Sequence, residues 1–144
     1  MADFQGYFIT SALSDGTVFP EQYIDWNSYK SIPNSVSELN SYVNSNNLLV
    51  RKVAKGKRSK IEFTTRPIND VELNEIWTWI RANMVVENEK ALNIIAWNEE
   101  EHCYKQYKVY VPDVTYGAKR HDANHIYYEG IRFAFITYGD GTNV

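Results

Sequence analysis

The sequence predicts an α+β domain that is mostly β-structure, a β-sandwich or split barrel flanked by one α-helix. Aromatic residues make up 15% of the chain, with 11 Tyr, 6 Phe and 4 Trp, and such residues favour pleated, half-buried surfaces. Short apolar runs bounded by turn-forming residues recur along the chain, and one segment shows clear helical spacing. We therefore expect several strands and a single helix packed on them.

Length and composition predict one domain spanning residues 1–144. The chain is 44% hydrophobic with a formal net charge of −3, a combination that argues against intrinsic disorder. The sequence has no apolar run near the roughly 20 residues that span a bilayer. Its start, MADFQGYFIT, lacks a secretory signal pattern, so we expect a protein that is made and kept in the cytoplasm, or assembled there into something larger. A single cysteine, Cys103, excludes an internal disulfide and a cysteine-rich zinc site.

The N-terminal segment predicts a hairpin of two short strands, residues 4–10 and 17–24, with a Ser-Asp-Gly turn between them. Pro20 removes a ladder donor and favours an edge position there. Residues 25–47 are rich in Ser and Asn, which compete with regular backbone pairing, and predict an extended or irregular connection. A short helix over residues 35–43 is the alternative, because Val36 and Leu39 fall at helical spacing.

Residues 48–65 predict a projecting β-hairpin, with two alternating runs joined at Lys55–Arg58 and Gly56 available for a positive φ. This segment gathers six of the fifteen basic residues of the chain. All six fall within positions 51–60, and the other 134 positions hold nine basic against eighteen acidic residues. The six basic residues are the candidate site of subunit contact: Arg51, Lys52, Lys55, Lys57, Arg58 and Lys60.

Residues 69–84 predict the one α-helix. Its apolar residues recur at helical steps and form a face that would cover a sheet. Asn69 and Glu72 form a capping-box pattern, and Asp70 adds negative charge near the positive end of the helix dipole.

The C-terminal half predicts three more strands. Residues 91–97 and 104–112 form two of them around a polar loop, and residues 126–138 form a long strand with apolar groups on both faces. Such a strand is typical of a central position in a sheet.

Two clusters of polar residues have the residue types of a catalytic or metal site. His121, Asp122 and His125 form HDANH, but they lie between strands and not on a helix, which favours a solvated loop over a metal site. Three consecutive glutamates, 99–101, precede His102 and predict a solvent-facing turn. A small enzyme built on these histidines remains an alternative, but no catalytic residue, cofactor or metal is predicted, and no phosphate-binding glycine loop is present.

The basic hairpin has three interpretations. The first is a solvated loop. The second is a ribbon that, with exposed aromatic rings, binds single-stranded nucleic acid. The third is an arm that contacts an acidic surface of a second copy. Because the remainder of the same chain is acidic, self-complementary charge favours assembly over nucleic-acid binding.

Five segments together resemble small tail proteins of siphophages and prophages of Gram-positive bacteria, and more broadly the distal tail and tail-tube group. The likeness covers most of the chain and follows the order of these phrases: FQGYFIT, SYVNSNNLLVRKV, KGKRSKIEFTTRPI, NDVELNEIWTWI and YYEGIRFAFI.

The resemblance implies a function as well as a fold. Members of that group form closed, commonly hexameric rings around a channel, so it implies a structural virion protein of the tail tip and not an enzyme. The resemblance implies that the protein binds further copies of itself and neighbouring tail proteins, and that DNA only passes through the channel. It implies no membrane anchor. The protein would be part of the virion and would be assembled in the host cytoplasm. The 48–65 hairpin would bridge adjacent subunits or rings, and acidic residues would line the channel.

Overall fold

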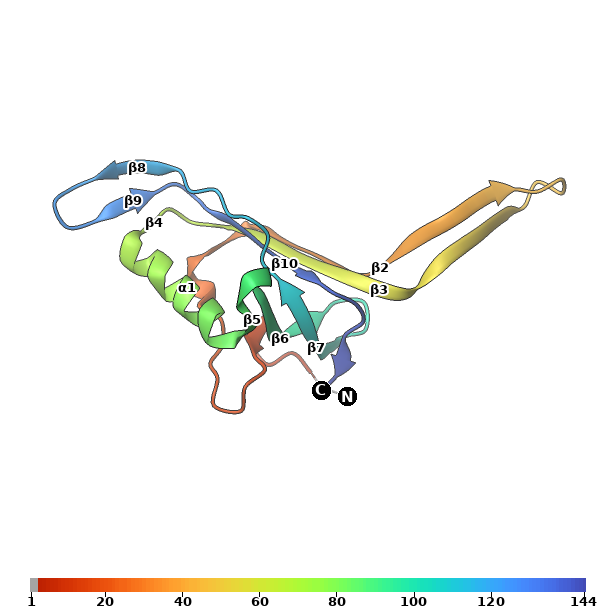
Figure 1. Ribbon diagram of the computed structural model, residues 1–144, viewed down its shortest axis with the longest axis horizontal. Coiled ribbons are helices and arrows are strands. Elements are labelled where there is room, and N and C mark those ends of the chain that lie inside the picture. Colours follow the sequence, from red (N-terminus) through yellow and green to blue (C-terminus); the bar gives the residue numbers. More distant parts are fainter. Residues whose placement is uncertain (1–2) are drawn as a thin grey trace.

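The structure is a computed structural model that describes residues 3–144. An eight-stranded antiparallel sheet curls into a half-barrel, and a separate three-stranded sheet lies beside it (Figure 1). The main sheet has the order β1 (Ile9–Ser11), β6 (Ala91–Asn98), β7 (Cys103–Tyr110), β10 (Arg132–Thr137), β3 (Leu49–Thr65) and β2 (Ile24–Val43), with β5 (Met84–Val86) beside β6 and β11 (Thr142–Asn143) beside β7. The small sheet has the order β4 (Ile68–Asn69), β9 (Ile126–Tyr128) and β8 (Ala118–His121).

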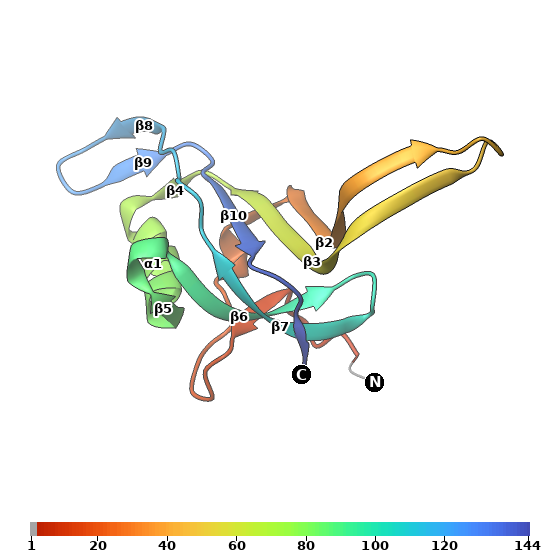
Figure 2. The ribbon, with the colours of Figure 1, turned by 45° about the vertical axis from the view of Figure 1, so that its right-hand side comes forward.

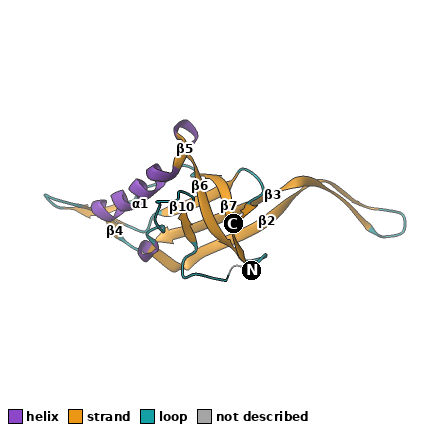
Figure 3. Cartoon of the chain, turned by 90° about the horizontal axis from the view of Figure 1, so that it is seen from below, coloured by secondary structure: helices purple, strands orange, loops and turns teal. Residues whose placement is uncertain are grey.

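One α-helix, α1 (Asp70–Asn83), lies against one side of the eight-stranded sheet, as Figure 3 shows from below. Two 3-10 turns, Glu21–Tyr23 and Glu87–Glu89, complete the elements. The predicted fold class, mostly β with one helix on a split barrel, is confirmed.

The predicted helix and its cap are also confirmed. The Asn69 side chain accepts the backbone N–H of Glu72 at 2.9 Å, and the Glu72 carboxylate accepts the backbone N–H of Asn69 at 3.2 Å. These two bonds satisfy amides that a helix start leaves free. The helix then buries Ile76 and Ile80 completely against the sheet.

The core fills the concave side of the curled sheet. Phe19 is its centre, because its ring meets Phe63, Trp79 and Phe135 edge-on with centroids 5.0 to 6.0 Å apart. Edge-to-face contacts of this kind add to the gain from burial. The largest fully buried side chains around it are Phe63, Phe133, Phe135, Ile9, Ile76, Ile80, Leu92, Ile94, Ile131 and Val109.

The predicted long strand 126–138 is wrong as one element, because the chain breaks at residues 129–131 into β9 and β10. A Cβ on Gly130 would lie 2.6 Å from the carbonyl oxygen of Thr65, so only glycine fits this close crossing. The backbone N–H of Thr65 donates to the Ile131 carbonyl at 2.8 Å, and the backbone N–H of Ile131 donates to the Thr65 hydroxyl at 3.0 Å. The break sends β9 into the small sheet.

The predicted N-terminal hairpin is only partly present. Ile9–Ser11 forms β1, but its ladder partner is β6, and Val18 contributes a single bridge to Thr10. The Glu21–Tyr23 turn ends the predicted second strand, and Ile24 already begins β2. The expectation that residues 91–97 and 104–112 pair is confirmed by β6 and β7.

Glu21 links this N-terminal segment to the core. Its carboxylate accepts the backbone N–H of Phe8 at 2.9 Å and of Ile9 at 3.4 Å. Burial raises the pKa of Glu21 above its ordinary value, although the two amide hydrogen bonds act in the opposite direction.

We expect Glu21 to make the fold less stable as the pH rises. Because its folded-state pKa is the higher one, its contribution is fully present below the unfolded pKa and is lost as the pH rises through the folded pKa. Glu21→Gln keeps an acceptor oxygen and removes the titration. The free energy of unfolding of both proteins is measured by urea titration from pH 4 to 8. As the pH rises, the wild-type protein should lose stability relative to Glu21→Gln. A difference that is independent of pH contradicts this account.

Tyr29 packs its ring between Phe8 and Phe63, with centroids 4.9 and 6.4 Å away. Its hydroxyl is buried and has no hydrogen-bond partner among residues 3–144. Burial raises the pKa of this phenol far above its ordinary value, with smaller contributions from Glu99 and Glu21.

Tyr29→Phe is therefore expected to raise the free energy of unfolding by about 1 kcal/mol, because it removes a desolvated group that gains no bond. Tyr104→Phe is the matched control. The Tyr104 hydroxyl donates to the carbonyl of Tyr7 and accepts the N–H of Gln5, both at 2.8 Å, so this variant should lose stability. Equal losses in both variants, measured by urea denaturation, would show that the Tyr29 hydroxyl is bonded.

Candidate functional site

The largest departure from a compact body is a two-stranded ribbon, built by β2 and β3, that runs far past the edge of the curled sheet (Figure 1). We call residues 35–58 the arm. Its base is the pair Ser35 and Arg58, and its tip is the turn 44–48. None of these residues is buried. The arm is thus held in shape by its own ladder and not by a core.

The predicted 48–65 hairpin is therefore corrected. Residues 49–65 are one strand, and their partner is the Ser/Asn-rich segment 24–43, so the turn lies at 44–48 and not at Lys55–Arg58. Asn44 closes that turn, since its side-chain oxygen accepts the N–H groups of Asn46 and Leu48 at 3.0 Å. This result also decides between strand and helix for residues 35–43, which are strand.

The segment around Gly56 is a bulge. Val36 pairs with Lys57 and Glu38 with Val53, so three residues of β3 lie opposite one residue of β2. Such an insertion bends and twists a ribbon, and Figure 2 shows the ribbon bent on its way out from the body. Gly56 has no positive φ here, which is why its presence did not mark a turn.

The base of the arm is fixed to the C-terminal end of β10 and to the segment that follows it. The backbone N–H of Lys57 donates to the Asp140 carboxylate at 2.7 Å, and that of Ser59 donates to the Thr137 hydroxyl at 2.7 Å. The Arg58 guanidinium reaches the Thr137 carbonyl at 3.4 Å. The direction in which the arm leaves the body is therefore set by specific bonds.

The six candidate basic residues all lie on β3, five of them in the arm and Lys60 just below it. Arg51 pairs with Glu38 at 2.6 Å, and Lys60 lies 3.6 Å from Glu62. Lys52 and Lys55 make no side-chain hydrogen bond or ion pair within residues 3–144. The arm has five basic residues against one acidic residue, and the rest of the chain has ten against seventeen.

Apolar side chains also stand exposed along the arm, which the charge pattern of the sequence did not reveal. Seven of them are between 41% and 65% exposed. A soluble domain rarely exposes so many large apolar groups on one element unless another molecule covers them. They are Val36, Leu39, Tyr42, Val43, Leu48, Leu49 and Val53.

The HDANH segment builds a turn between β8 and β9. The Asp122 carboxylate accepts the N–H groups of Asn124 and His125 at 2.8 Å, and the His125 ring lies 3.1 Å from the Asp70 carboxylate. Backbone N–H groups hold the pKa of Asp122 below its ordinary value. Within residues 3–144 no group of three or more His, Cys, Asp or Glu side chains has a metal-binding arrangement.

The glutamate run 99–101 forms the exposed turn between β6 and β7, as predicted. Glu101 pairs with Lys105 at 2.5 Å, a contact that lowers the pKa of Glu101 and raises that of Lys105. Asn34 donates to Glu100 and Glu101 at 3.3 and 3.1 Å. The turn therefore braces β2 where the arm begins.

Comparison with known proteins fits this architecture. Residues 1–138 match a family of unknown function, DUF6711. The chain belongs to that family. A comparison of this DUF6711 chain with curated protein sequences gives no match.

Two solved structures share the fold of this DUF6711 chain over nearly its whole length. One is the tail of an empty gene transfer agent (GTA) particle with C6 symmetry, 11% identical, with a TM-score of 0.54 and 98% of each chain covered. The other is the virion of a native GTA particle, 10% identical, with a TM-score of 0.53 and 99% of each chain covered. In residues 3–144, no helix has the length and apolar character needed to span a membrane.

Proposed function

We propose that this DUF6711 chain is a structural protein of a phage tail tip, which forms a ring that joins the tail tube to the tip or baseplate and leaves a channel for DNA. The fold supports this proposal, because both similar solved structures come from GTA particles and one of them is a tail with C6 symmetry. No catalysis is part of the proposal.

The arm is the observation that carries the proposal. An isolated two-stranded ribbon is marginally stable in water, and this one exposes apolar and basic side chains along its length. A second molecule that covers the arm would bury the apolar groups and neutralise the charge. The interface residues we propose are Arg51, Lys52, Lys55, Lys57, Arg58 and Lys60.

The partner we propose for the arm is a second copy of the chain. The body is acidic where the arm is basic, so adjacent copies in a ring are complementary. Repetition of one such contact closes into a ring, and six copies match the C6 symmetry of the similar tail. Other tail proteins would stack on the ring, DNA would pass through without stable binding, and the product would be a virion component assembled in the host cytoplasm.

The proposal also includes the group of tail proteins and the type of host. We place the chain with the distal tail group of siphophages and prophages of Gram-positive hosts on the basis of the sequence phrases it shares with them.

The experiment is a measurement of solution mass and particle shape. Purified protein, alone and co-expressed with the tail proteins encoded beside it, is measured by native mass spectrometry and by electron microscopy. Rings with a channel are the expected particles. A protein that stays monomeric at high concentration and joins no ring with its neighbours contradicts the proposal.

Single-stranded nucleic acid is the second candidate partner of the arm, because Lys52 and Lys55 have no acidic partner among residues 3–144 and Tyr42, on the same arm, is 55% exposed. Counterion release then predicts binding that weakens steeply as salt rises. Absence of binding to an oligonucleotide at low salt, measured by fluorescence anisotropy, dismisses this candidate.

A further inference from the structure

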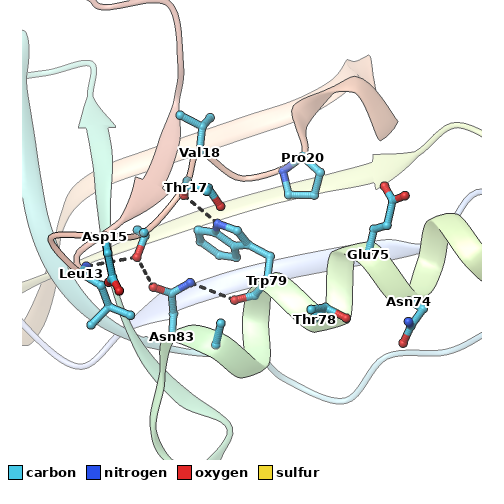
Figure 4. A pocket seen from close by; sticks show the side chains of 13 residues that line it. Leu13, Asp15, Thr17, Val18, Pro20, Asn74, Glu75, Thr78, Trp79 and Asn83 are labelled. Carbon is cyan, nitrogen blue, oxygen red and sulfur yellow. Dashed lines mark hydrogen bonds between the residues drawn. The ribbon is translucent and has the colours of Figure 1, made fainter.

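A groove lies between α1 and the loop of residues 11–20 (Figure 4). Its volume is about 520 Å³. Leu13, Val18 and Pro20 line the loop side, and the Trp79 indole extends from α1 toward the loop. Leu13 and Val18 are 52% and 44% exposed, so the groove offers apolar surface that the chain itself leaves uncovered.

The groove is built rigidly. The Trp79 indole N–H donates to the Thr17 carbonyl at 2.8 Å, and the Asn83 amide donates to the Trp79 carbonyl at 2.9 Å. Asn83 also accepts the hydroxyl of Ser11, both residues being buried. These bonds hold the loop against the helix, so the groove is open before any ligand arrives.

The charge of the groove is negative. Asp15 and Glu75 are among its lining residues, and no Lys or Arg is. The Glu75 carboxylate accepts the Tyr23 hydroxyl, which fixes it at the rim. Asp15 makes no side-chain hydrogen bond or ion pair within residues 3–144.

The tip of the arm has the complementary properties. Val43, Leu48 and Leu49 are about 60% exposed beside the basic Arg51 and Lys52. The arm leaves the body on the side opposite to α1 and the 11–20 loop, as both views in Figures 1 and 2 show, so it points away from its own groove. A contact between tip and groove must therefore join two different molecules.

We propose that the groove is the receptor for the arm tip of a second copy of this chain. The apolar tip side chains enter between the 11–20 loop and α1, and Lys52, which has no ion pair within residues 3–144, approaches Asp15 and Glu75. The contact is head-to-tail, since each copy donates an arm on one side and accepts one on the other, and repetition of such a contact gives a closed ring or a stack. The inference rests on the proposed function, and it names the surface that accepts the arm.

A complementation experiment tests this inference. An armless variant, in which residues 37–56 are replaced by Asn-Gly, has a groove and no arm to donate. A groove variant, Thr78→Arg, places a long cation in the groove, because Thr78 is exposed and lines it. Val85→Arg is the control, because Val85 is also exposed and lies outside the groove.

We expect each of the first two variants to be monomeric by native mass spectrometry and their mixture to give a heterodimer of one armless and one groove-variant copy. The difference in mass identifies which copies pair. Val85→Arg should assemble as wild type does. Thr78→Arg that assembles as wild type does, or a mixture that stays monomeric, overturns the inference.

Failure of the groove inference can be told apart from failure of the ring proposal. If Thr78→Arg still forms rings as the wild-type protein does, the groove is not the receptor for the arm, and the ring proposal is unaffected. A small molecule or another tail protein found in the groove has the same consequence. Wild-type protein that forms no ring with its neighbours removes the ring proposal, and the groove inference falls with it.

Discussion

Replacement of residues 37–56 by Asn-Gly is expected to abolish assembly and to leave the body folded. Val36 and Lys57 are directly paired across the ladder, so a two-residue turn can join them. None of the deleted residues is buried, and the bonds that hold Ser59 and Arg58 to Thr137 remain. The loss of particles should be complete, since one contact repeated around a ring fails at every position at once.

The measurement has two parts for this variant. Thermal unfolding by circular dichroism should give a midpoint within a few degrees of wild type, and mass spectrometry should give a monomer. A variant that still forms rings contradicts the assigned role of the arm. A variant that unfolds at a much lower temperature shows that the arm stabilises its own body, which also contradicts it.

Phe19→Ala is expected to lower the free energy of unfolding by about 3–5 kcal/mol, the usual cost of truncating a buried aromatic residue. Phe19 is 2% exposed and meets three aromatic rings, and its backbone N–H donates to the Ile9 carbonyl at 3.1 Å. Small domains have a stability of roughly 5–15 kcal/mol. The change would therefore remove a large share of it.

Urea denaturation checks this prediction. The midpoint should fall while the slope of the free energy against urea stays the same, because the unfolded surface hardly changes. Val85→Ala is the control, since Val85 is 52% exposed and its truncation should cost less than about 0.5 kcal/mol. A loss below about 1 kcal/mol in Phe19→Ala shows that Phe19 is not the centre of the core.

Local chemistry in the sequence predicted the elements whose signals are local. The α1 cap depends on Asn69 and Glu72, three residues apart, and the β6–β7 hairpin depends on adjacent runs, so both were correct. The strand break at Gly130 was missed, because it is caused by the approach of Thr65, which is distant in sequence.

The pairing within the arm also joins residues distant in sequence, and the sequence did not predict it. The sequence located its basic residues, but a glycine between lysines looks like a turn, and a Ser/Asn-rich segment looks irregular. Pairing of residues 24–43 with 49–65 over such a length is stabilised by the ladder itself and leaves little apolar pattern to read. The groove was missed because its two walls, residues 11–20 and α1, are separated by some fifty residues and meet only in the fold.

We propose that the arm contacts a second copy of this chain. Electron cryomicroscopy of the assembled particle tests it most directly, at a resolution at which the two strands of the arm are traced. We expect every arm to leave its own body and to lie on the acidic body of an adjacent copy. Arms that fold back on their own molecules, or that contact only nucleic acid in the channel, would contradict it.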